Sequence, residues 1–75
     1  MNGDHLIQMA NQIGVFFESM PERDVAIEGV ATHIKKFWDP RMRRAFLELA
    51  DDEATRARLS DMVQQAVRKH RGLLA

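Results

Sequence analysis

The sequence predicts an all-α fold, a small bundle of about four short helices that forms a single helical domain over residues 1–75. Apolar residues recur every three or four positions along most of the chain, and no segment alternates apolar and polar residues as a half-buried strand does. A chain of 75 residues has the length of one domain. A core of this size yields only about 3–5 kcal/mol, and the absence of cysteine excludes disulfides, so we expect a partner chain to add stability.

The first two helices are expected at about 5–20 and 22–37. Asp4 is the expected N-cap of the first helix, and Ser19 with Glu22 has the Ser-x-x-Glu spacing of a capping box for the second. The apolar face of the first helix comprises Leu6, Met9, Ala10, Ile13, Phe16, Phe17 and Met20. That of the second comprises Ala26, Ile27, Val30, Ile34 and Phe37, with His33 and Trp38 on its flanks.

The third and fourth helices are expected at about 40–50 and 53–71. Asp39 followed by Pro40 combines a capping residue with the residue preferred at the first helical position, so the third helix begins at Pro40. Its expected buried residues are Met42, Ala45, Phe46 and Leu49. The acidic run 51–53 suits the start of the fourth helix. Its expected apolar face comprises Leu59, Met62, Val63, Ala66, Val67 and His70.

Composition argues against several classes of function. Eleven basic residues balance eleven acidic ones, so the chain has no overall charge with which to attract nucleic acid or an anionic membrane. No signal peptide and no apolar stretch of about 20 residues is present, and we expect a cytoplasmic protein. The three histidines have no metal-ligand spacing, and no hydroxyl is placed to pair with a histidine base. We therefore expect neither a metal site nor catalytic residues, and no enzyme.

Two glycines and one tryptophan interrupt the ordinary pattern. Gly14 and Gly29 lie inside helices, where each costs about 0.5–1 kcal/mol relative to alanine. Close packing of the first two helices is the expected reason, and a docking groove for a partner is the alternative. Trp38 is either a ring at the edge of the core or an interface residue, since tryptophan is common in interface hot spots.

Arginines gather where the third helix begins. Arg41, Arg43 and Arg44 lie in its first turn, where cations oppose the helix dipole. They form either a solvated face compensated by Asp39 and Glu48, or a binding site for phosphate or for a partner's carboxylates. Lys35 and Lys36 would enlarge such a site.

Two stretches of the chain form recognisable motifs. The first is Met9-Ala10-Asn11-Gln12-Ile13-Gly14 followed by Phe16-Phe17. The second runs from Ala31 through His33, Ile34 and Lys36 to Phe37-Trp38-Asp39-Pro40-Arg41-Met42-Arg43-Arg44. Both motifs resemble those of a known family, the delta subunit of soluble NAD-dependent formate dehydrogenase, a molybdenum or tungsten enzyme. The resemblance extends from Leu6 to about Val67. It departs at Ala50–Arg56, which is acidic where the family has a glycine-rich turn.

The resemblance implies a non-catalytic accessory subunit, an all-α partner of the catalytic alpha subunit that supports assembly of the complex or loading of its molybdenum cofactor. No cofactor would be bound stably, and only a transient contact with bis-molybdopterin guanine dinucleotide is implied. The residues expected to bind the partner or an anion are Asn11, His33, Lys36, Trp38, Asp39, Arg41, Arg43 and Arg44. Replacing Arg41 and Arg43 by glutamate is expected to keep the helices and abolish activity of the holoenzyme. Whether the subunit remains in the mature enzyme stays open, as does the choice of metal.

Two alternatives belong to other classes of protein. A helix-turn-helix nucleic-acid-binding module would read DNA with its third helix, but it would normally be basic. A homodimeric helical interaction module would cover Phe16, Phe17 or Trp38 on pairing, and such a homodimer is also compatible with the isolated delta subunit.

Overall fold

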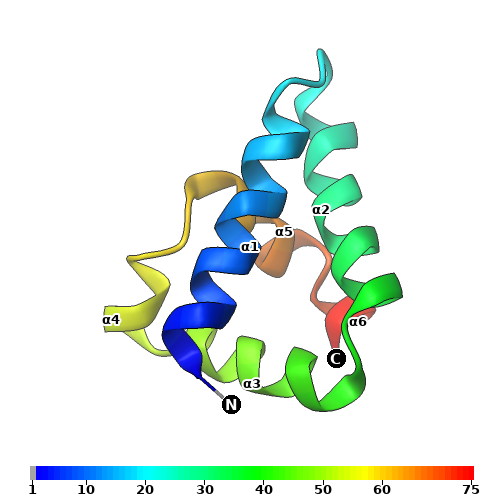
Figure 1. The fold of residues 1–75 in the computed structure, drawn as a ribbon. Helices are drawn as coiled ribbons and strands as arrows, with labels where there is room; N and C mark the ends of the chain where they lie inside the picture. The colour runs from blue at the N-terminus through cyan, green and yellow to red at the C-terminus, as the bar shows by residue number, and fades with distance from the viewer. Residues whose placement is uncertain (1) are drawn as a thin grey trace.

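The computed structural model describes residues 2–75, and these contain helices and no strands, which confirms the all-α prediction. The six helices are α1 (Gly3–Glu18), α2 (Arg23–Phe37), α3 (Pro40–Asp51), α4 (Glu53–Arg56), α5 (Asp61–Lys69) and α6 (Arg71–Leu74). Figure 1 shows α1 and α2 side by side and antiparallel, joined by a short turn. In the same view α3 crosses below both helices, α5 packs behind them, and the start of α1 and the end of α6 lie near α3.

The core lies between α1, α2, α3 and α5. Small residues let the helices approach each other, since the fully buried positions include Ala10, Ala26, Ala31 and Ala66. The largest fully buried side chains are those of Phe46, Ile27, Ile34, Met62, Leu74, Val30 and Val63. Each helix alone would be only marginally stable in water, and here the apolar faces of the helices are buried against one another.

Helix N-caps agree with the sequence at two places and differ at two. The Asp52 carboxylate caps α4 by accepting a hydrogen bond from the Thr55 amide at 3.1 Å, as the acidic run 51–53 predicted. The Asp39 carboxylate accepts a hydrogen bond from the Met42 amide at 2.9 Å, and α3 begins at Pro40 as predicted. The predicted cap Asp4 lies inside α1, whose N-cap is Asn2. The predicted capping box before α2 is wrong, because the Ser19 hydroxyl donates to the Phe16 carbonyl and the N-cap Glu22 makes no side-chain bond.

The predicted fourth helix over 53–71 is wrong, because the chain breaks twice within it. The first break, between α4 and α5, is held by the Asn11 side chain of α1. Asn11 donates to the Arg58 carbonyl at 3.0 Å and accepts from the Ser60 amide at 2.8 Å. These two backbone groups would bond within a continuous helix, and here they bond to α1. The Ser60 hydroxyl then caps α5 by accepting from the Val63 amide. A second break at His70 separates α5 from α6.

Three predicted core residues are exposed instead. Phe16 and Phe37 keep 72% and 66% of their surface accessible, and Met20 is exposed as well. Because α2 ends at Phe37, Trp38 has an extended backbone, and its ring is buried edge-on against Phe46 with centroids 5.4 Å apart. Periodicity continued through the end of a helix therefore assigned the wrong aromatic residue to the core. It also missed several buried residues, namely Ile7, Ala31, Leu47, Ala50 and Leu74.

Both helical glycines mark close packing. A Cβ atom on Gly29 would lie 2.5 Å from the Phe17 ring, so α1 and α2 approach each other there as predicted. Gly14 faces α5 rather than α2, since a Cβ atom there would lie 3.0 Å from the Val63 methyl group. The predicted reason for the glycines is confirmed, but the neighbour of Gly14 is different.

Candidate partner-binding face

The guanidinium of Arg43 joins three parts of the backbone. It donates to the Trp38 carbonyl at 2.8 Å and to the Lys35 carbonyl at 3.3 Å, both at the end of α2. A third bond of 3.3 Å reaches the Leu74 carbonyl at the end of α6. Because these carbonyls lie where helices end, a cation is favoured there by the helix dipoles. Arg43 is thus a structural residue of the α2–α3 corner, and its donors are largely used within the fold.

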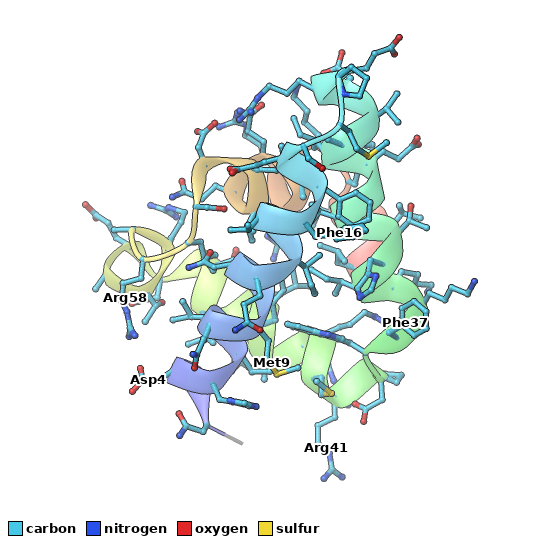
Figure 2. The ribbon with its side chains drawn as sticks, turned by 45° about the horizontal axis from the view of Figure 1, so that its top comes forward. Asp4, Met9, Phe16, Phe37, Arg41 and Arg58 are labelled. Carbon is cyan, nitrogen blue, oxygen red and sulfur yellow. The ribbon has the colours of Figure 1, made fainter. Side chains whose placement is uncertain are left out.

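The remaining cations of this corner point into solvent. Arg41, Arg44, Lys35 and Lys36 are exposed, and Figure 2 shows Arg41 extending away from α3. Lys36 lies over the exposed Phe37 ring, with its Nζ atom 5.7 Å from the ring centroid. Within residues 2–75, the salt bridges leave all four of these cations unpaired. These cations are available to an external anion.

The start of α3 fits a phosphate group poorly. Asp39 already occupies the Met42 amide with its carboxylate, and that negative charge would repel a phosphate at the helix end. Arg43 is held by backbone carbonyls, so only Arg41 and Arg44 remain of the three predicted guanidinium groups. We therefore assign no residue of this corner to the molybdenum cofactor. Separate carboxylates on a protein surface suit the exposed cations better.

A groove of about 310 Å³ opens between α1 and α2. It is lined by Met9, Gln12, Ile13, Phe16, Phe17, His33 and Trp38, and no carboxylate is among them. Figure 2 shows Met9 and Phe16 on the same side of the molecule as Phe37. Exposed apolar side chains that gather on one face are typical of an interaction site.

Aromatic rings form a continuous row along this groove. The Phe16 and Phe17 rings pack edge to face with centroids 5.1 Å apart, and Phe17 lies 6.3 Å from the His33 ring. His33 in turn lies 4.7 Å from the Phe37 ring. The structure thus brings His33, Trp38 and Lys36 together around one groove, whereas Asn11 is a structural residue on the other side of α1.

Sequence reasoning did not identify Phe37 as a site residue, and it named Phe16 only as a residue that a homodimer would cover. Both fall on the apolar stripes of their helices, and the spacing alone gives them the same weight as buried residues. The signal that could have identified Phe37 is its position directly before the helix-ending Trp38-Asp39-Pro40 segment.

Four ion pairs of the described residues join segments of the fold away from this groove. Arg58 binds Asp4 at 2.8 Å, and Arg23 binds Asp61 at 2.7 Å. Lys69 approaches Asp24 at 3.6 Å, which joins α5 to α2. Arg71 donates two bonds of 2.8 Å to the Asp51 carboxylate, and this hydrogen bonding lowers the pKa of Asp51. A hydrogen bond from Gln65, with another from Arg23, lowers the pKa of Asp61.

Two other hollows each contain an ion pair of the fold. One of about 410 Å³ contains Asp51 and Arg71, and one of about 500 Å³ contains Asp4 and Arg58. The groove between α1 and α2 differs from both in its aromatic lining. Among residues 2–75, no cluster of three or more His, Cys, Asp or Glu side chains is arranged to hold a metal ion, and none of the described helices has the length and hydropathy of a membrane span.

Comparison with known proteins gives one match. The family model of the NADH-dependent formate dehydrogenase delta subunit, FdsD, matches residues 5–67. No curated protein and no solved structure matches significantly. The matched residues include both motifs, the whole of the groove and the α2–α3 corner. The chain therefore belongs to the family of formate dehydrogenase delta subunits.

Proposed function

We propose that this chain is a non-catalytic accessory subunit that binds the catalytic alpha subunit of formate dehydrogenase in the cytoplasm. In that role it supports loading of the molybdenum cofactor or assembly of the holoenzyme. The observation that carries the proposal is the match of residues 5–67 to the delta-subunit family. Formate oxidation and electron transfer to NAD then belong to the larger subunits.

The surface of the molecule supports a role in binding. Among residues 2–75, the most exposed large hydrophobic side chain is that of Phe16, and unpaired cations lie near the other end of the same face. Apolar anchors next to charges are suited to a protein surface, where the anchors give affinity and the charges give orientation.

The decisive experiment compares the formate dehydrogenase complex produced with and without this chain. A tagged chain is expected to co-purify with the alpha subunit. The complex made without the chain should contain less molybdenum, or fewer assembled subunits, and oxidise formate more slowly. Equal metal content, assembly and activity in the two preparations would contradict a role in loading or assembly.

A second measurement tests the non-catalytic part of the proposal. The purified chain is incubated with formate and NAD, and formation of NADH is followed by absorbance. No turnover is expected. Turnover that persists after the chain is freed of the larger subunits would show that it is an enzyme.

A further inference from the structure

We propose that the groove between α1 and α2 is the docking surface for a segment of a larger formate dehydrogenase subunit. This segment carries apolar side chains that enter the groove and carboxylates that meet Lys36 and Arg41. The inference rests on the proposed function, since it takes binding to a larger subunit as given. It adds which face of this chain binds and what chemistry the partner must present.

Exposure of the aromatic residues is the first argument. Phe16 and Phe37 flank the groove and lie largely in solvent, although both are among the residues expected in a core. Their rings contact Phe17 and His33, so each is held in place by a neighbour rather than projecting alone. Aromatic residues, phenylalanine among them, are enriched in protein interfaces relative to the rest of the surface.

The floor of the groove is preformed. Trp38 is 4% exposed and packs edge-on against Phe46 of the core. Gly29 lets the Phe17 ring approach the α2 backbone, because any side chain at position 29 would meet that ring. A partner therefore enters a hollow that already exists, and little conformational entropy is lost on binding.

Charge determines which partner fits. The groove lining contributes no carboxylate, while Lys36 lies over the Phe37 ring beside His33. Figure 2 shows Arg41 on α3 extending from the end of the molecule nearest Met9 and Phe37. The four ion pairs of residues 2–75 involve none of these cations. The complementary surface therefore has carboxylates beside its apolar anchors.

A second copy of this chain fits less well. Two copies that met through this face would bury Phe16 and Phe37, but each would bring its own Lys36 and no carboxylate from the groove. Like charges at an interface oppose association. A larger subunit is free to supply the missing carboxylates, and we commit to that occupant.

The apolar part of the proposal is tested with neighbouring residues of one helix. Phe16→Asp places a charge at the groove, and Val15→Asp is its matched control, because Val15 is 67% exposed and lies outside the groove lining. Affinity of each full-length variant is measured for the formate dehydrogenase complex expressed without this chain. We expect Phe16→Asp to weaken binding about thirtyfold or more, as for an interface hot spot, and Val15→Asp to change it less than about threefold. Phe37→Asp should repeat the effect from the other helix.

The charged part is tested with Lys36→Glu combined with Arg41→Glu. Arg68→Glu is the control, since Arg68 is an exposed cation on α5 and lies outside the groove. The double variant is expected to bind about tenfold more weakly and to lose much of its salt dependence, whereas the control should keep both properties. Circular dichroism and thermal unfolding verify that every variant is folded.

The outcomes separate this inference from the proposed function. If the wild-type chain binds the complex and Phe16→Asp and Phe37→Asp bind equally well, the groove is not the docking surface, although the proposed function stands. A wild-type dimer in sedimentation that Phe16→Asp dissociates, with no binding to the complex, would assign the groove to a second copy. A monomer that binds no larger subunit would overturn the proposed function itself.

Discussion

Arg43 should be the most important residue of the arginine cluster for stability, and Arg43→Met tests this. The substitution keeps much of the aliphatic side chain and removes the guanidinium, which donates to the Trp38, Lys35 and Leu74 carbonyls. A hydrogen bond to a charged group contributes about 1.5–3 kcal/mol. Only the 2.8 Å bond to Trp38 has the short distance of a strong charge-assisted bond, and the two at 3.3 Å are weaker.

We therefore expect Arg43→Met to destabilise the fold by about 2–3 kcal/mol, most of it from the bond to Trp38. For a domain of this size, 1 kcal/mol corresponds to a change in Tm of about 4–8 °C. The assay is urea denaturation followed by circular dichroism, with a thermal scan in parallel. Arg41→Met is the control, because Arg41 is exposed, and it should change stability by less than about 0.5 kcal/mol.

Equal midpoints for Arg43→Met and Arg41→Met would refute this reasoning, since the three carbonyls would then be satisfied equally well by water. Arg43→Lys provides an intermediate case. Its ammonium keeps the charge but cannot reach three carbonyls with one planar group, so part of the loss should remain. If Arg43→Met destabilises the fold as expected, Arg43→Glu is a poor probe of partner binding, because that substitution would also disturb the fold.

Three further predictions concern other residues. Gly29→Ala should lower the stability of the fold by about 1 kcal/mol. The added methyl group overpacks against Phe17 at a cost of about 1–3 kcal/mol, which exceeds the gain in helix propensity of about 1 kcal/mol. A net gain of stability in urea denaturation would contradict this prediction. Gly72→Ala should be stabilising by about 0.5 kcal/mol in the same assay, since no atom lies within 4 Å of the added methyl, and a loss would contradict the open space seen there. Asp51→Asn should make acid unfolding less steep. The hydrogen bonding from Arg71 holds the folded pKa of Asp51 below its usual 3.8, so its stabilisation is present above that value and is lost as the pH falls through the lower folded pKa. An unchanged pH profile of the unfolding midpoint for this variant would show that the ion pair has no part in acid stability.

Helix boundaries were predicted correctly where the residues that determine them are adjacent in sequence. Asp39 and Pro40 specify the start of α3 through the φ angle of proline and the capping carboxylate, and both act within one turn. The break between α4 and α5 depends instead on Asn11, which is 47 residues from Arg58 along the chain. No window of sequence contains both partners, so helix periodicity continued through the break.

In the candidate site too, some features depend on neighbouring residues and others on contacts between residues far apart in sequence. The cluster of cations around residue 40 is visible in the sequence, but which of them the fold uses depends on where the ends of α2 and α6 meet. Arg43 is a structural residue because the Leu74 carbonyl lies within hydrogen-bond distance of its guanidinium. Arg41 is exposed to solvent. Likewise, the exposure of Phe37 and the burial of Trp38 follow from the turn that ends α2, which reverses the assignment that a regular helix would give.

Burial of Trp38 gives the protein a spectroscopic probe of its own. The chain contains one tryptophan and no tyrosine, so its near-ultraviolet fluorescence comes almost entirely from a single indole. That indole is shielded from water against Phe46 and forms part of the groove floor. Its emission in the isolated chain should therefore be blue-shifted and resistant to quenching by acrylamide, and it should report both unfolding and the arrival of a tryptophan-free peptide in the groove.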